Sequence, residues 1–426
     1  MFLFAEQHEL YRQATLLTPS ISTRSTMMNE TYRTFNTSLF DDVMANWSES
    51  GPASLTGDVD CQQFNSYIQS VPISKPVVNF RLANHYIALV ICIIGVIFNA
   101  LLIAVLTQPK IRSPTNTIMT ALAVADQIMM VTYGVYVVYF RIFYSPLLDK
   151  FESSWSLQWI YVTLYHYIYA YSHVLGEWLT LAIAIIRYRA CYPRAPPHDF
   201  TQNQAMLVIA VTCIGCLIIN IPNFLYFNVV ENPGTRCFAT TKSEVVKSIP
   251  AFDDFWFWFI FTTYRLLPNI LLLVFTGLII RELKNISVRR QVTLGNRNCR
   301  QEVWATKMLV AIVIFTMITE FPKLIAPLVY RAKEESKSDE NFIEILEANL
   351  LEKSVNSFLE CFILLDSCVN FVIYCSMSKM FRETFVNMFI PSWFPISSQS
   401  TRSLTVTATT ATTPPLEMKL LAKTKV

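Results

Sequence analysis

Apolar residues in this chain gather into seven long runs that are separated by short polar segments. A helix that crosses the hydrocarbon core of a bilayer needs about 20 predominantly apolar residues, and each run is long enough. The runs cover residues 85–107, 115–140, 158–188, 205–228, 255–281, 304–330 and 350–375. The pattern predicts an all-α membrane protein with a seven-transmembrane helix bundle over residues 83–376.

A shorter pattern follows the seventh run. Within residues 377–390, the large apolar side chains fall on one side of a helix: Phe381, Phe385, Met388 and Phe389. Lys379 and Arg382 are available to lipid headgroups. These features are typical of a short amphipathic helix that lies on the membrane surface.

The two ends of the chain are polar. Residues 1–82 lack a signal-peptide pattern and contain Asn-X-Ser/Thr sequons at Asn29, Asn36 and Asn46, so we expect a disordered, glycosylated extracellular tail. Residues 391–426 are rich in serine and threonine and should form a disordered cytoplasmic tail. That tail is either simply solvated or also a phosphorylation cluster that a partner reads. Thr424–Val426 could additionally bind a domain that captures C-termini.

Composition indicates that the chain lies in a membrane, and the distribution of charge indicates how it is oriented there. Hydrophobic residues make up 53% of the 426 residues and charged residues only 15%, which excludes an ordinary soluble protein of this length. Basic residues concentrate in the loops after the first, third and fifth runs, whereas the loop at 331–352 is acidic. Because short cytoplasmic loops are enriched in lysine and arginine, we predict a multi-pass plasma-membrane protein with its N-terminus outside.

Two of the ten cysteines, Cys61 and Cys237, are predicted on the extracellular side. Disulfides form in oxidising compartments. The two residues either pair, which would tie the N-terminal tail to the loop after the fourth run, or remain free thiols. We predict the pair.

Ionisable and amide side chains interrupt five of the runs. Such groups are functional candidates, because an unpaired one in hydrocarbon costs several kcal/mol. They are Asn99, Asp126, His166, His173, Glu177, Glu320, Glu360, Asp366 and Asn370. The sequence has no metal-ligand spacing, nucleophile–base motif or phosphate-binding glycine loop, so we predict no enzyme, no cofactor and no nucleic-acid binding. Only nine glycines occur in the chain, which argues against a transporter or channel.

Prolines lie within the fourth, fifth and sixth runs, at Pro222, Pro268 and Pro322. Each removes a backbone donor and bends its helix. Pro322 follows Glu320 by two residues, and a bend beside a polar group is a plausible hinge. A static kink is the alternative.

Together these positions resemble a rhodopsin-like (class A) G protein-coupled receptor over roughly residues 80–390. The matching features are Gly95 with Asn99, LAVAD ending at Asp126, Arg187 followed by Tyr188, the three prolines, and NFVIY ending at Tyr374. The segments SHVLGEWLTLAIAIIRYRACYP, YRLLPNILL, MITEFPKLI and DSCVNFVIYCSMSKMFRETF further resemble invertebrate, in particular nematode, receptors for myosuppressin and related FMRFamide-like peptides.

The chain departs from the usual class A pattern at several positions. Ile186 replaces the acid before Arg187, Phe371 replaces the proline after Asn370, and Glu320 replaces a tryptophan. The usual cysteine at the outer end of the third run is also missing, so Cys237 would need another partner, which favours Cys61.

The resemblance implies an amidated peptide ligand that ends in Arg-Phe-amide and binds among the outer ends of the helices. A guanidinium forms charge-assisted bonds with a carboxylate, so Glu320 or Asp366 would receive the ligand arginine. His173 would line the pocket and Tyr264 would flank it. Alternatively, Glu320 is protonated and serves as an internal switch.

The resemblance also implies how activation works. Asn99, Asp126, Asn370 and Tyr374 would form an internal polar network, although Gly176 stands where a sodium-binding serine is common. Glu302 precedes Pro322 by twenty residues, or about 30 Å of helix, which places it level with Arg187. We predict an inactive-state Arg187–Glu302 pair that breaks when the sixth helix moves outward about Pro322.

The implied partners are a heterotrimeric G protein and, through the Ser/Thr-rich tail, arrestin and receptor kinases. A chemosensory receptor for small molecules is the main alternative. The acidic loop at 331–352 favours basic peptides as ligands.

Overall fold

The computed structural model describes residues 75–143, 154–191, 200–231, 238–243, 246, 248–249, 252–290, 297–334 and 342–389. The predicted sequons at Asn29, Asn36 and Asn46, the Cys61–Cys237 pair and Thr424–Val426 lie outside these residues. Within the described part, seven helices are long and apolar enough to cross a membrane. The prediction of a seven-helix bundle is therefore confirmed.

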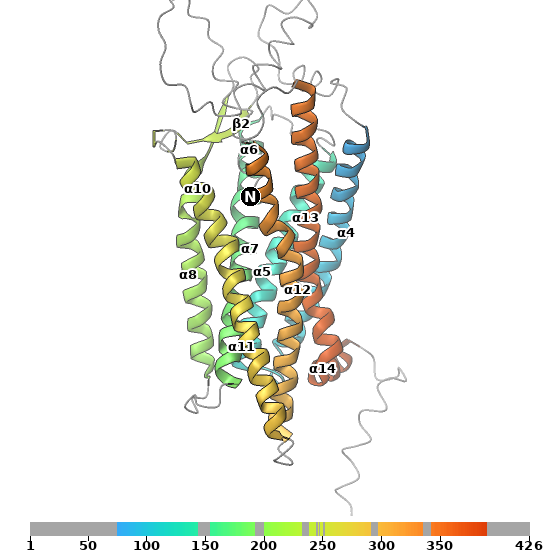
Figure 1. Ribbon diagram of the computed structural model, residues 1–426. Helices are drawn as coiled ribbons and strands as arrows, with labels where there is room; N and C mark the ends of the chain where they lie inside the picture. The colour runs from blue at the N-terminus through green and yellow to red at the C-terminus, as the bar shows by residue number, and fades with distance from the viewer. Residues whose placement is uncertain are drawn as a thin grey trace, which may run out of the picture.

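The helices stand roughly side by side along one axis, with a β-hairpin at one end and a short final helix at the other (Figure 1). The first four membrane-length helices are α4 (Lys75–Leu106), α5 (Pro114–Tyr136) with η1 (Val137–Phe143), α6 (Trp155–Tyr161) with η2 (Val162–Tyr169) and α7 (Ala170–Cys191), and α8 (Gln202–Tyr226). The others are α10 (Phe252–Ile260) with η3 (Phe261–Leu266) and α11 (Leu267–Arg290), α12 (Arg297–Glu334), and α13 (Phe342–Met377).

Local sequence signals explain where several helices start. Ser113 caps α5 by accepting a hydrogen bond from the Asn116 backbone, and Pro114 takes the first helical position, where a missing N–H costs nothing. Thr201 and Gln204 form a reciprocal capping box at the start of α8. These caps fix the point at which each chain segment re-enters the bundle.

The second, third and fifth membrane-length helices each contain a π-helical stretch, named η1, η2 and η3. Such stretches are frequent at functional sites. The third one supplies Arg265 and Tyr264 immediately before Pro268. Proline also lies inside α8 at Pro222 and inside α12 at Pro322 and Pro327.

Side-chain burial is inverted relative to a soluble protein. Large apolar residues such as Ile93, Val211 and Ile318 are exposed on the outside of the bundle, where lipid would surround them. Charged and amide groups such as Glu320 and Asn370 are buried inside. This arrangement is what a bilayer requires, because hydrocarbon offers polar groups no partner.

Close packing of three helices depends on Gly95. A Cβ atom there would come within 2.8 Å of Met130 Cε and 3.0 Å of Cys368 Sγ. Glycine therefore allows α4 to approach α5 and α13 closely. Asn84 adds a polar tie, because its side-chain amide donates to the Ser354 carbonyl at 3.0 Å.

The strands β1 (Phe227–Glu231) and β2 (Phe238–Lys242) pair antiparallel, with Val229 opposite Thr240. They follow α8 and lie at the end of the bundle opposite the short final helix (Figure 1). Gln158 on α6 donates to the Thr240 hydroxyl at 2.8 Å. The hairpin is thereby attached to the third membrane-length helix.

The short helix α14 (Lys379–Phe389) follows α13 as predicted. Phe381 is buried and contacts Phe371 and Tyr374, so this ring belongs to the bundle, whereas Phe389 is exposed. The Arg382 guanidinium donates to the Cys375 and Ser376 carbonyls. It thus satisfies carbonyl groups at the end of α13 that have no helical partner.

A candidate ligand and activation site

Glu320 lies on α12 in the interior of the bundle, with only 4% of its side chain exposed. Its Oε2 atom is 3.1 Å from Arg265 Nη1 on η3, and its Oε1 atom is 3.5 Å from His173 Nε2 on α7. The two carboxylate oxygens therefore face different helices. The Arg265 guanidinium therefore already occupies one oxygen of the Glu320 carboxylate.

A second ion pair lies beside the first. Lys323 is one helical turn beyond Glu320 on α12, and its Nζ atom is 2.7 Å from Glu360 Oε2 on α13. Both side chains are almost fully buried. The Tyr169 hydroxyl on η2 donates a further hydrogen bond to the same carboxylate oxygen. Three membrane-length helices thus meet at Glu360.

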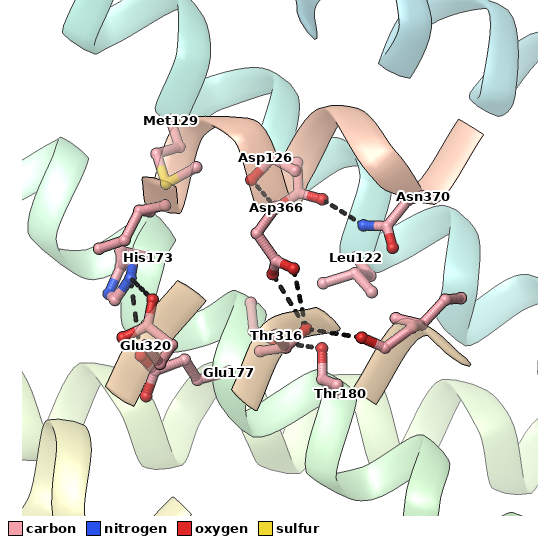
Figure 2. A pocket seen from close by; sticks show the side chains of 14 residues that line it. Leu122, Asp126, Met129, His173, Glu177, Thr180, Thr316, Glu320, Asp366 and Asn370 are labelled. Carbon is pink, nitrogen blue, oxygen red and sulfur yellow. Dashed lines mark hydrogen bonds and ion pairs between the residues drawn. The ribbon is translucent and has the colours of Figure 1, made fainter. Parts of the chain in front are cut away.

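A small cavity of about 30 Å³ lies next to Glu320, a volume that can hold about two water molecules. Figure 2 shows His173, Glu177 and Glu320 on one side of it and Asp126, Asp366 and Asn370 on another. Four carboxylates line the cavity, at Asp126, Glu177, Glu320 and Asp366, and His173 is the sole basic residue among the lining residues.

The Asp366 and Asp126 carboxylates bind different partners. Asp366 accepts a hydrogen bond from the Thr316 hydroxyl, which is 3.0 Å from both of its oxygens. Asp126 accepts from the Ser367 hydroxyl at 3.1 Å and from the Asn370 amide at 3.2 Å. These bonds connect α5, α12 and α13 around the cavity (Figure 2).

The structure brings together only part of the predicted internal network. Asp126 and Asn370 are hydrogen-bonded. Asn99 is fully buried, but its amide has no hydrogen-bond partner among the described residues. Tyr374 is buried against Phe381. Gly176 lies against Asp126, because a Cβ atom there would be 3.6 Å from Asp126 Oδ1.

The remaining predicted residues lie at different distances from the cavity. His173 and Asp366 line it. Tyr264 is buried and donates to Asn220 Oδ1 on α8 at 2.5 Å, and it is not a lining residue. Arg187 is half-buried near the end of α7. Glu302 belongs to α12, but its side chain lies outside the described part.

Sequence reasoning missed Arg265 and Lys323. Both are cations inside apolar runs, so the rule that flagged Glu320 applies equally to them. Arg265 stands in YRLLP and Lys323 in EFPK, close to residues that were already singled out. Their partners, however, lie on other helices, and spacing along the chain does not reveal them.

Breaking a buried ion pair by removing one partner is strongly unfavourable, so the two pairs hold the fifth, sixth and seventh membrane-length helices in one arrangement. The cavity beside them has an excess of acidic groups. A cation that enters it would compete for carboxylates on α7, α12 and α13.

Comparison with known proteins identifies the class. Residues 86–391 match the sequence model of the family described as serpentine type 7TM GPCR chemoreceptor Srw. The chain belongs to this family of seven-transmembrane G protein-coupled receptors. It is therefore a multi-pass membrane receptor and not an enzyme.

Three individual receptors are similar to this chain in sequence. The chain is 26% identical to the G-protein coupled receptor dmsr-1 of Caenorhabditis elegans, in an alignment that covers 77% of this chain and 72% of the relative. It is 24% identical to the sex peptide receptor of Drosophila melanogaster, over 73% of each chain. It is 22% identical to the FMRFamide receptor of Drosophila melanogaster, over 74% of this chain and 57% of that receptor.

Proposed function

We propose that this chain is a plasma-membrane receptor for an amidated FMRFamide-like or myosuppressin-like peptide, with its N-terminus extracellular. The observation that carries the proposal is the group of four carboxylates around one cavity, of which Asp126 and Glu320 are buried. A buried carboxylate needs a compensating positive charge or hydrogen bonds. A guanidinium provides both.

The names of the relatives support a peptide rather than a small molecule. One relative is named as an FMRFamide receptor and another as a sex peptide receptor. The family description, in contrast, contains the word chemoreceptor, which favours the second candidate, a chemosensory receptor for a small molecule. Both candidate functions assume the same helix bundle, and they differ in the class of ligand that activates it.

In the proposed mechanism the ligand arginine binds Glu320 or Asp366. Binding at Glu320 weakens its pair with Arg265, since one carboxylate then serves two guanidinium groups. Binding at Asp366 replaces the hydrogen bond from the Thr316 hydroxyl. Either change alters contacts that α12 makes with its neighbours, and the bend at Pro322 allows its G protein-facing end to move.

Calcium and cyclic-AMP responses test the proposal in cells that express the full chain. Arg-Phe-amide peptides would be compared with versions in which arginine is replaced by citrulline, on wild type, Glu320→Gln and Asp366→Asn. If one acid binds the ligand arginine, its variant should respond equally weakly to both peptides. Glu282→Gln is the matched control, because Glu282 is a buried acid on α11 and does not line the cavity.

Two results would contradict the peptide-arginine contact. If every variant kept the wild-type preference for arginine over citrulline, neither acid would bind it, and Glu320 would be an internal switch. If no peptide activated a receptor whose surface expression was verified, the chemosensory function would be favoured.

The proposal also includes the two terminal segments of the chain. Glycans at Asn29, Asn36 and Asn46 and a Cys61–Cys237 disulfide would stabilise the extracellular side. Phosphorylation of the Ser/Thr-rich tail by receptor kinases would recruit arrestin. Mass spectrometry of peptides before and after reduction tests the disulfide, and finding both cysteines alkylated without reduction would exclude it.

A further inference from the structure

Three side chains beside the cavity form a compact set of metal-ligating atoms. His173 and Glu177 are four residues apart on α7 and therefore share one face of that helix. Glu320 faces them from α12. One ligating atom from each of the three residues lies within 4.8 Å of the other two. His173 Nε2 is 3.6 Å from Glu177 Oε1 and 3.5 Å from Glu320 Oε1.

These separations suit a tetrahedral metal ion. Zinc binds imidazole nitrogen and carboxylate oxygen at about 2.0–2.2 Å. At the tetrahedral angle, such bonds place neighbouring ligand atoms roughly 3.3–3.6 Å apart. The imidazole is already at this distance from both carboxylates, and the ligating oxygens of the two carboxylates lie within 4.8 Å of each other.

The Glu177 carboxylate is poorly compensated in this arrangement. Only 9% of its side chain is exposed, and neither of its carboxylate oxygens has a hydrogen-bond partner among the described residues. The side chain lines the cavity (Figure 2). A carboxylate buried in this way requires a cation or a proton, and His173 is too distant for a normal hydrogen bond.

Glu320 can bind a metal without leaving Arg265. Its Oε1 atom faces His173, whereas its Oε2 atom is 3.1 Å from Arg265 Nη1. Hydrogen bonds to the outer oxygen commonly orient a ligating carboxylate. The other nearby cation, Lys323, is neutralised by Glu360 at 2.7 Å, so its repulsion of a metal ion is reduced.

We propose that His173, Glu177 and Glu320 bind a divalent transition-metal ion, of which Zn²⁺ fits best. One nitrogen and two oxygen ligands leave a fourth position toward the cavity. Because the ligands come from α7 and α12, the ion would join these helices and oppose the separation that receptor activation requires. Metal binding itself does not depend on which ligand activates the receptor.

Cobalt absorbance and thermal unfolding of the purified full-length receptor test this site without any peptide. Co²⁺ in a tetrahedral site should give visible absorption bands that Zn²⁺ removes by competition. Zn²⁺ should also raise the midpoint of thermal unfolding, since a ligand that binds only the folded state stabilises it. Glu177→Gln and His173→Ala should each weaken Zn²⁺ binding more than about 100-fold, beyond the effect of an outer-shell change.

His85→Ala is the matched control, because His85 is a buried imidazole on α4 that does not line the cavity. It should bind zinc like the wild type. Equal Zn²⁺ affinity in wild type, Glu177→Gln and His173→Ala would overturn the proposal, as would the absence of any zinc effect on the wild type. Glu177→Gln keeps the shape of the side chain, so a folded variant should be obtainable even if His173→Ala unfolds.

Discussion

Arg265 on η3 and Glu320 on α12 form an ion pair in the interior of the bundle, with Nη1 and Oε2 3.1 Å apart. Less than a tenth of either side chain is exposed. Residues 55 positions apart in the sequence thereby connect the fifth and sixth membrane-length helices. Glu320 also faces His173 on α7, so side chains from three helices meet at one carboxylate.

Removing only Arg265 should destabilise the receptor strongly. Arg265→Met leaves the Glu320 carboxylate without its cation, and losing one partner of a buried pair costs about 3–5 kcal/mol. The double variant Arg265→Met with Glu320→Leu should recover much of that loss. Thermal unfolding of the purified receptor measures both.

Lys379→Met is the control, because the Lys379 side chain is 82% exposed and pairs with Glu383 at 3.6 Å. An exposed pair contributes less than about 1 kcal/mol. If Arg265→Met were as stable as Lys379→Met, the buried pair would not hold the helices together.

Tyr169→Phe should lower the stability of the receptor, because it removes one of the contacts at Glu360. The hydroxyl donates to a carboxylate that also binds Lys323, and a hydrogen bond to a charged group contributes about 1.5–3 kcal/mol. Tyr171→Phe should cost only about 0.5–1.5 kcal/mol, since that hydroxyl donates to the neutral Cys213 carbonyl at 3.2 Å. Equal melting temperatures for the two variants would argue against a charged Glu360.

Gly95→Leu should disrupt the packing of α4 on α5 and α13. Even a Cβ atom there would be 2.8 Å from Met130 Cε and 3.0 Å from Cys368 Sγ, and overpacking costs about 1–3 kcal/mol or more. Gly215→Ala on α8 is the contrasting change, because a Cβ atom there meets nothing within 4 Å. Detergent-solubilised yield and thermal unfolding should fall only for Gly95→Leu.

Glu302→Gln should raise signalling in the absence of ligand. The proposed Arg187–Glu302 pair would restrain α12, and neutralising the acid would remove that restraint. Basal cyclic-AMP and calcium signals, normalised to surface expression, measure the effect. Glu383→Gln on α14 is a suitable control, because Glu383 pairs with the exposed Lys379 at 3.6 Å. Unchanged basal signalling in Glu302→Gln would exclude a restraining role for the pair.

The sequence alone determined the helices, their approximate limits and the presence of polar groups inside them. The physical reason is that a bilayer demands about 20 apolar residues for each crossing and makes every buried charge conspicuous. The same reasoning identified Glu320, His173, Asp126 and Asp366 as interior residues. Apolar periodicity after the seventh run likewise predicted α14, because only one face of such a helix is apolar.

Only the tertiary structure decided which interior groups meet. Arg265 pairs with Glu320 and Lys323 with Glu360, whereas Asn99 has no bond to Asp126, and Tyr264 binds Asn220. These choices depend on the rotation of each helix about its axis and on its distance from its neighbours. Packing sets both, through close approaches such as the one at Gly95, and the order of residues along one helix does not encode where another helix will lie.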